Sequence, residues 1–175
     1  MPETALYRLR RATHLCVACG VLLPDGHAIV RCAVCAVRDR AIKKARRLYR
    51  QAAGTCVGCG DSAVLAAMVG NQNALCEACY YRKTANRRLG SPRYAPLLRE
   101  KFLAQDGRCP YSGESLTLGF NATLDHILPT SRYPELRGDP ANVEWVIDWV
   151  NLMKQDATPD EFRERLRHIL SHRWP

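Results

Sequence analysis

Apolar residues after about residue 140 follow a helical period. They recur three and four residues apart, as on the buried face of a helix. With Asp139 as N-cap and Pro140 in the first turn, this spacing predicts a helix over residues 141–155, with Trp145 joining its buried face. The residues that carry the spacing are Val146, Trp149, Val150 and Met153.

Turn and capping residues place the other elements of this region. The pattern predicts a helix over residues 97–105 and, after a turn, a hairpin around residues 112–114. A strand should end near His126, because Pro129 forces a loop soon afterwards. A capping box with proline at the first helical position predicts a last helix over residues 158–170.

The first half of the chain contains a repeat of two four-cysteine units. Each unit has two Cys-x-x-Cys pairs, and two such pairs complete a tetrahedral shell of four thiolates around zinc. We therefore expect two structural zinc ions rather than redox or disulfide roles. Pairing within each unit is the simplest arrangement, and pairing between units stays open. The cysteines are Cys16, Cys19, Cys32 and Cys35 in the first unit and Cys56, Cys59, Cys76 and Cys79 in the second.

The surroundings of the cysteines repeat as well. Gly20 and Gly60 follow the first pairs, where positive φ lets the backbone curl around a metal. The second pairs run into basic, helix-compatible segments, the second of which Gly90 should end. Units this small need metal to fold. Residues 14–90 resemble zinc-ribbon or treble-clef modules.

The charge is distributed unevenly. Residues 1–108 contain 19 basic and 7 acidic residues (+12), whereas residues 109–175 contain 7 and 10 (−3). Two zinc ions with eight thiolates would leave about +8 on the first part, which favours nucleic acid as partner. The alternative is a protein-docking module with a solvated basic surface. The candidate contact residues are Lys43, Lys44, Arg46, Arg47, Arg50, Arg82, Lys83, Arg87 and Arg88.

Length limits the chain to one ordinary domain or two to three very small ones, and the predicted strands and helices make the expected fold class α+β. At 175 residues the chain excludes a large multidomain enzyme. It has neither an apolar run of roughly 18 residues nor a signal-peptide core, so we expect a soluble, cytoplasmic protein without membrane contact. We expect an N-terminal tail (1–13), two zinc modules (14–52 and 53–90), a linker (91–96) and a C-terminal domain (97–175).

The C-terminal domain resembles the HNH endonuclease family. The segment LDHILPTSRYPELRGDPANVEWVIDWVNLMKQDATPDEF contains Asp125-His126 at a strand end, then Asn142, then Asn151 and Lys154, in the order of that family. The resemblance covers about residues 97–165 and implies a ββα-metal nuclease core.

Two positions depart from the family pattern. Many HNH domains have Cys-x-x-Cys pairs of their own, whereas here Ser112 stands where a partner of Cys109 would be. The segment CPYSGESL resembles the zinc-free variant found within CRISPR effector nucleases. The third signature residue is Asn151 rather than histidine, a substitution that retains a ligand oxygen.

The resemblance implies a one-metal hydrolysis of phosphodiester bonds. His126 would be the general base, and Asp125 and Asn151 would bind one catalytic Mg²⁺ or Mn²⁺. Asn142 would fix the loop that carries His126. The ordinary pKa of histidine, about 6.5, suits proton abstraction at neutral pH, and hard oxygen ligands suit Mg²⁺.

We therefore expect an endonuclease for duplex DNA. Lys154 would steady a phosphate, with Arg132 as a weaker candidate. One core cuts one strand, so a double-strand break would need a homodimer, an accessory protein or sequential nicks. The alternatives are an adaptor for nucleic acid or protein with a passive HNH scaffold, and an HNH enzyme that acts on RNA.

Overall fold

The computed structural model describes residues 4–24 and 30–172, and its contacts divide the chain into two compact units. The first unit is Met1–Ala52 and the second is Ala53–Pro175. No helix in the described ranges is both long and apolar enough to cross a membrane. The described elements are helices and a two-stranded sheet, so the protein is a mixed α+β structure. Each unit contains one of the four-cysteine clusters.

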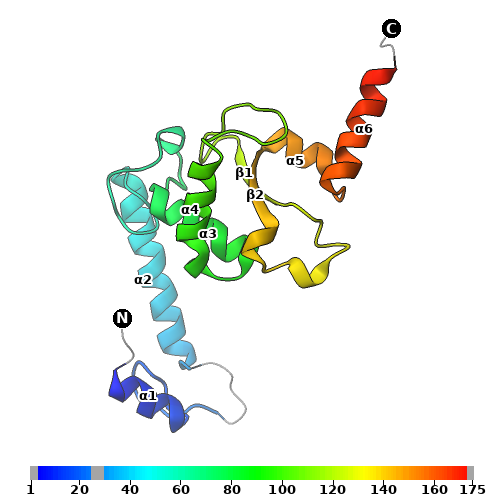
Figure 1. The fold of residues 1–175 in the computed structure, drawn as a ribbon. Helices are drawn as coiled ribbons and strands as arrows, with labels where there is room; N and C mark the ends of the chain where they lie inside the picture. The colour runs from blue at the N-terminus through cyan, green and yellow to red at the C-terminus, as the bar shows by residue number, and fades with distance from the viewer. Residues whose placement is uncertain (1–3, 25–29, 173–175) are drawn as a thin grey trace. The chain divides into compact units, whose positions relative to one another are not determined.

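In its described residues, the first unit contains two helices and the first cysteine cluster (Figure 1). Helix α1 (Ala5–Ala12) lies in the predicted tail, and Thr4 caps it by accepting a hydrogen bond from the Tyr7 amide. Arg10 of α1 donates to the carbonyl groups of Val17 and Ala18, which attaches α1 to the first Cys-x-x-Cys pair.

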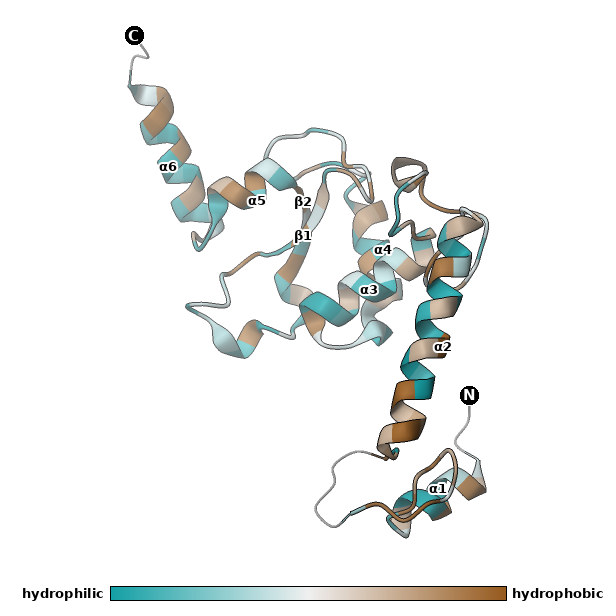
Figure 2. Ribbon diagram, turned by 180° about the vertical axis from the view of Figure 1, so that it is seen from behind, coloured by the Kyte–Doolittle hydropathy of each residue, from teal (hydrophilic) through white to brown (hydrophobic). Residues whose placement is uncertain are grey.

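Helix α2 (Ala33–Ala52) begins between the last two cysteines of the first unit and contains no buried residue. Hydrophobic residues recur along its length between hydrophilic ones (Figure 2). An ion pair joins Asp39 to Arg31, and Lys43 lies 3.2 Å from the same carboxylate. The helix therefore depends on its propensity and on these pairs rather than on burial.

The larger hydrophobic core of the second unit is shared by both of its predicted parts, and a smaller core surrounds Cys56 and Cys76. Helix α3 (Glu77–Leu89) starts at the second cysteine cluster and ends at Gly90, whose φ of 72° is the left-handed cap that the sequence predicts. Its residues Tyr81, Ala85 and Leu89 are buried together with Trp145 from the C-terminal part. The second cysteine unit is thus continuous with the C-terminal part of the chain.

The segment predicted as a linker is structured. Residues 92–94 form the short 3-10 helix η2 (Pro92–Tyr94), which leads directly into α4 (Ala95–Ala104). Ala95 and Leu98 are buried in the shared core. Gly113 has a φ of 72°, and Arg108 and Ser115 form a single bridge, so the predicted hairpin is present as one tight turn.

A two-stranded antiparallel sheet replaces the predicted helix over residues 141–155. β1 (Ala122–His126) pairs with β2 (Val143–Ile147), and only then does α5 (Asp148–Lys154) begin. The register places Asp125 opposite Glu144 and Leu124 opposite Trp145. The helical prediction is wrong because β2, in which Val143, Val146 and Ile147 are β-branched, pairs with β1 and is buried at every position except Glu144.

The correction changes which residues form the core. Trp145, Val146 and Val150 are buried as expected, whereas Trp149 and Met153 are 41% and 45% exposed. The short 3-10 helices η3 (Pro134–Leu136) and η4 (Pro140–Asn142) lie between the strands, and η1 (Ala66–Met68) lies in the second cysteine unit. The last helix, α6 (Pro159–Ser171), begins at Thr158 with the predicted capping box.

Trp145 is the central residue of the shared core. Its side chain is fully buried, its indole N–H donates to the Leu98 carbonyl at 2.9 Å, and its ring packs on Tyr80, Tyr81 and Phe102. It therefore connects β2 to both α3 and α4.

Replacing Trp145 by phenylalanine should destabilise the protein by about 2–4 kcal/mol, because the change opens a cavity and leaves the Leu98 carbonyl without its donor. Urea unfolding followed by far-UV circular dichroism measures this as a lower midpoint. The matched control is Trp149→Phe, at a half-exposed site, which should cost less than about 0.5 kcal/mol. Equal midpoints for the two variants would contradict the central role of Trp145.

Candidate functional site

The four cysteines of each unit converge on one point. In each cluster the four sulfur atoms lie within 4.8 Å of one another. The Sγ atoms of Cys19 and Cys32 are 3.7 Å apart, and those of Cys59 and Cys76 are 3.6 Å apart. Tetrahedral zinc with bonds of about 2.3 Å would place its sulfurs about 3.8 Å apart, whereas a disulfide needs about 2.05 Å. The geometry fits a metal in each cluster.

Each cluster contains the two Cys-x-x-Cys pairs of a single unit, so the simplest arrangement expected from the sequence is confirmed. Among the described residues, these two clusters are the only groups of three or more histidine, cysteine or acidic side chains arranged to hold a metal. Each cluster could hold one structural zinc ion. Because the protein fills all four ligand positions, neither cluster leaves an open position for substrate.

Both clusters are built by the same backbone turn. Gly20 and Gly60 have φ angles of 81° and 93°, and their amides donate to the carbonyl groups of Cys16 and Cys56 at 2.7 Å. Only glycine adopts this conformation without strain, as the sequence predicts. The Asp61 amide also points at the Cys59 sulfur, at 3.5 Å.

Backbone amides favour the thiolate at the first cysteine of each cluster. Amides of Cys19 and Cys32 lower the pKa of the Cys16 thiol to about 5. Burial raises the pKa of Cys56, but the amides of Cys76, Cys59 and Gly58 outweigh burial and bring it to about 6. Neighbouring cysteines raise the pKa of Cys35 to about 12. Four thiolates together therefore need a cation, as in metal sites whose ligands release protons on binding.

The second cluster has no room for an extra methyl group at Gly58. A Cβ atom there would lie 2.9 Å from the Sγ atom and 3.2 Å from the Cβ atom of Cys79. The corresponding residue of the first unit is Ala18. The second cluster is therefore the more tightly enclosed of the two at this position.

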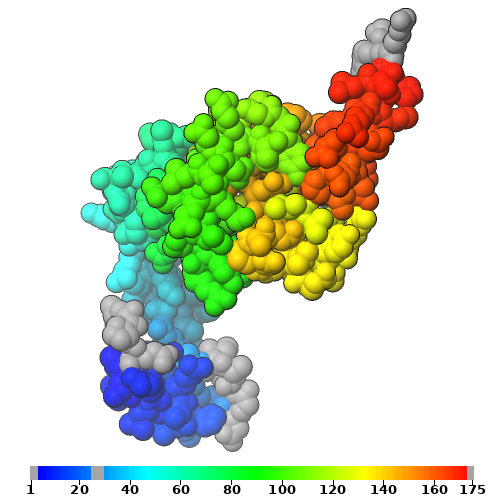
Figure 3. All heavy atoms as spheres, in the orientation of Figure 1, coloured from blue at the N-terminus to red at the C-terminus, as the bar shows by residue number. Residues whose placement is uncertain are grey.

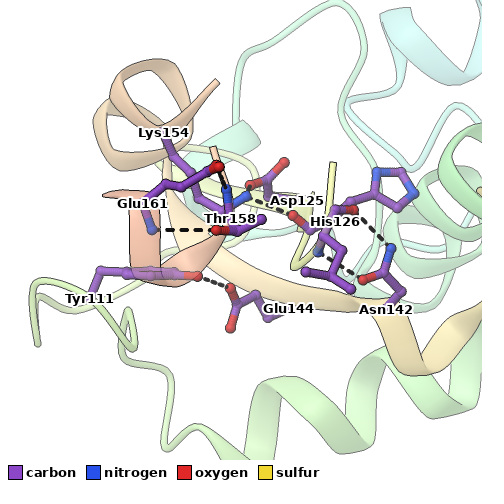
Figure 4. Close-up of polar contacts among 9 residues, drawn as sticks. Tyr111, Asp125, His126, Asn142, Glu144, Lys154, Thr158 and Glu161 are labelled. Atoms are coloured by element: carbon purple, nitrogen blue, oxygen red, sulfur yellow. Dashed lines mark hydrogen bonds and ion pairs between the residues drawn. The ribbon is translucent and has the colours of Figure 1, made fainter. Parts of the chain in front are cut away.

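A second group of polar residues gathers where β1 ends and α5 packs beside it (Figure 4). Lys154, on α5, is fully buried, and its ammonium group donates to Asp125 Oδ2 at 3.0 Å and to the His126 carbonyl at 2.8 Å. A buried ammonium is tolerated only when it is paired and hydrogen-bonded. Lys154 thus attaches the end of β1 to α5.

This position corrects the role expected of Lys154. The sequence predicts that it steadies a phosphate, but a side chain with no exposed surface cannot reach one in this conformation. Arg132 is about half exposed, and it is paired with Glu161 at 2.6 Å. Arg132 and the amide of Thr158 lower the pKa of Glu161 to about 2. Arg132 therefore holds the loop after β1 against the start of α6, and Figure 3 shows that loop on the surface of the second unit.

Asn142 fixes the backbone that follows His126. Its side-chain oxygen accepts from the Leu128 amide at 2.8 Å, and its side-chain nitrogen donates to the Leu128 carbonyl at 3.0 Å. The Asn142 carbonyl also accepts from the amide of Ile127. The loop that begins directly after His126 is thereby closed onto the residue that precedes β2.

Asp125 and His126 face different neighbours, as alternation along a strand requires. Asp125 is directed at Lys154, whereas the imidazole of His126 points away from Lys154, and its Nε2 lies 3.2 Å from the Arg137 carbonyl (Figure 4). Asn151 lies on α5 three residues before Lys154, hence on the same face of the helix. Within the described ranges, no hydrogen bond is found for the Asn151 side chain.

Glu144 is a further acidic residue of this region that sequence reasoning missed. It lies opposite Asp125 in the sheet and accepts a hydrogen bond from the Tyr111 hydroxyl at 2.6 Å. Burial raises its pKa, while the Tyr111 hydroxyl and Lys154 oppose this shift. Only the strand pairing reveals the position, because a helix over residues 141–155 would have separated Glu144 from Asp125.

Arg88 brings the second cysteine unit to the same region. Burial and the neighbouring Arg87 lower its pKa, and the charge of Asp125 acts in the opposite direction. Its Nε atom is buried and has no hydrogen-bond partner in the described part of the chain. Gly138, next to the carbonyl that His126 approaches, lies close to the carbonyl of Leu89 at the end of α3. Arg88 is thus a partly buried cation with one unsatisfied nitrogen, and it interacts with the charge of Asp125 near the end of β1.

The other basic candidates are mostly on exposed helix surfaces. On α2, Lys43 is paired with Asp39, and Arg50 is partly buried. On α3, Arg82, Lys83 and Arg87 are exposed. Tyr80 and Tyr81, by contrast, pack into the core instead of standing between the charges. Cys109, the ninth cysteine, is also buried in the core, away from both clusters.

Comparison with protein-family models and with curated proteins gives no match for this chain. The assignment of a function therefore depends on the residues and their geometry.

Replacing Gly58 by alanine should weaken zinc binding in the second cluster by about tenfold or more, because the new methyl group meets the Cys79 sulfur. Release of zinc to a chromogenic chelator measures this: two ions per chain in the native protein, one of which leaves faster in the variant. The reverse change in the first cluster, Ala18→Gly, is the control and should leave release nearly unchanged. A protein purified without zinc would contradict the assignment of both clusters.

Proposed function

We propose that the protein is a metal-dependent DNA endonuclease of the HNH type. The observation that carries the proposal is the strand, strand, helix arrangement of β1, β2 and α5, with Asp125-His126 at the end of the first strand. Asn142 closes the loop behind them and α5 presents Asn151, which is the order of residues that the HNH resemblance implies.

His126 is the proposed general base. It is the last residue of β1, and the loop that follows it is held by the side-chain amide of Asn142, so the backbone on both sides of the ring is fixed. The Arg137 carbonyl is 3.2 Å from Nε2 and, as an acceptor, would favour the tautomer with the proton on that nitrogen. Nδ1 would then be the nitrogen that accepts a proton from water.

Asp125 and Asn151 are the residues that would hold Mg²⁺ or Mn²⁺. Both offer oxygen, the ligand atom that these ions prefer, and Lys154 occupies only one of the two Asp125 oxygens. Such an ion, when bound, stabilises negative charge on the departing oxygen. In this proposal Lys154 is a positioning residue, because it fixes both the carboxylate of Asp125 and the backbone of His126.

The basic helices supply affinity. Exposed lysine and arginine residues on α2 and α3 would contact the phosphate backbone without reading its sequence. Because α3 is buried on its other face, phosphates bound along it would lie on the same unit as Asp125 and His126. The zinc clusters would then hold the DNA-binding helices, while the end of β1 cuts.

Replacing His126 by alanine should lower the rate of plasmid nicking in Mg²⁺ by about 100-fold or more, since a general base contributes that much. Agarose gels of supercoiled plasmid, with linear duplex and RNA assayed in parallel, measure the rate and the preferred substrate. His168→Ala, on the exposed face of α6, is the control and should cut normally. Undiminished nicking by His126→Ala would defeat the mechanism, and native protein that binds DNA without cutting it would favour the adaptor.

Arg88 should contact the phosphate that is cut, because its buried Nε atom lacks a partner and its guanidinium interacts with the charge of Asp125, which lies near the end of β1. Under saturating enzyme, Arg88→Gln should lower the single-turnover rate by about 100-fold. The neighbouring Arg87 is exposed and would contact the phosphate backbone of the DNA. Arg87→Gln should therefore change that rate by less than about threefold and mainly reduce the salt dependence of DNA binding. Equal losses in the two variants would contradict a specific role for Arg88.

A further inference from the structure

A cavity of about 660 Å³ lies between α3, η2 and the start of α4, away from the residues assigned to cutting. Its walls are mainly apolar and include Pro92, Pro96 and the ring of Tyr81. This volume is within the range of about 300–1,000 Å³ typical of ligand pockets. All three wall elements belong to the second unit, so the cavity is formed without any partner.

Three arginines surround this apolar floor. Arg82 comes from α3, Arg93 from η2 and Arg99 from α4. No acidic residue is among the described residues that line the cavity, and Glu77 lies 3.0 Å from Arg99. Arg93 donates to the Tyr94 hydroxyl and lies over its ring. No partner is found for Arg82 among the residues that the structure describes. The rim therefore attracts anions.

Tyr81 adds a hydrogen-bond donor. The residue is only 2% exposed and lines the cavity, and its hydroxyl, which is not fully buried, has no hydrogen-bond partner in the described ranges. Its ring is fixed by edge contacts with Tyr80 and Trp145. A group that enters the cavity with an acceptor oxygen could accept a hydrogen bond from this hydroxyl.

We propose that this cavity binds an acidic peptide segment of a partner protein. An apolar side chain of the peptide would fill the floor, and carboxylates beside it would accept hydrogen bonds from Tyr81 and from the arginines. Clusters of arginine recognise acidic motifs in this way. Burial of an apolar anchor in a pocket contributes most of the affinity of such contacts.

The apolar floor favours a peptide over nucleic acid. In a duplex the bases are stacked inside, and the phosphates offer nothing that an apolar cavity would stabilise. A phosphate could pair with the exposed arginines from outside, but it would leave the floor and the Tyr81 hydroxyl unused. The occupant therefore needs both an anionic and an apolar part.

A fluorescein-labelled peptide, Asp-Asp-Leu-Trp-Asp-Asp, tests the proposal by fluorescence anisotropy with the full, zinc-loaded chain. We expect binding that weakens about tenfold when asparagine replaces every aspartate, and about as much when glycine replaces leucine and tryptophan. Tyr81→Phe, which retains the ring, and Arg82→Gln, at an exposed site, should each weaken binding by about five- to tenfold. Arg167→Gln on α6 is the charge-matched control and should bind as the native protein does.

Absence of binding to the native protein, or binding that Tyr81→Phe and Arg82→Gln leave unchanged, would overturn the proposal. Displacement of the labelled peptide by a single-stranded oligonucleotide, but not by the unlabelled peptide, would also overturn it in favour of a nucleotide site. Because the assay measures no cleavage, its outcome is independent of whether the protein is a nuclease.

Discussion

The second unit depends on one helix that has two roles. At its first turn, α3 carries Cys76 and Cys79 of a four-sulfur cluster, and further along it buries Tyr81, Ala85 and Leu89 in the hydrophobic core. Four thiolates repel one another unless a cation binds them, so the metal that fits the cluster would also fix the start of the helix. The core connects the start of this helix to the sheet. Trp145 of β2 packs between α3 and α4, and β2 pairs with β1 in a fixed register. The second four-cysteine cluster and the sheet with its polar end are thus connected through one core.

The polar end of the sheet illustrates how a small core can contain charge. Lys154 has no exposed surface, and the cost of burying its ammonium is offset by the Asp125 carboxylate and the His126 carbonyl. Removing one partner of such a pair typically costs about 3–5 kcal/mol, because the remaining charge is left buried. Glu144, opposite Asp125, shares the field of the same ammonium, and burial raises its pKa. The Lys154 ammonium pairs with Oδ2 of Asp125. The other carboxylate oxygen, Oδ1, is then the ligand atom that the proposed function requires.

The sequence predicted those features that are determined locally. Three such features are found in the structure: the cysteine clusters, the positive φ of the glycines that follow the first pairs, and the capping box at Thr158. Each depends only on residues close together in the chain. The helix over residues 141–155 failed for the opposite reason: whether Val143 to Ile147 form strand or helix is decided by pairing with β1, a contact between distant segments. For the same reason the sequence did not place Glu144 near Asp125. It also did not predict that Lys154 is buried, since burial of a lysine depends on what packs over it. The candidate residues Asp125, His126, Asn142 and Asn151 were found from their order along the chain, and their mutual geometry came only with the fold.

The unsatisfied groups of the second unit indicate where it meets other molecules. Folded proteins leave few buried polar atoms without partners, and each such atom has a cost that some function can offset. Here the Arg88 Nε atom is buried without a partner, and the Tyr81 hydroxyl, which is not fully buried, also has none among the described residues. Both residues belong to α3, yet they have different surroundings. Arg88 has the charge of Asp125 near it and no apolar cavity, which suits a phosphate. Tyr81 lines an apolar cavity with arginines at its rim, which suits a carboxylate attached to an apolar side chain. One helix, held at its start by a cysteine cluster, would thus serve two ligands of different chemistry through residues seven positions apart.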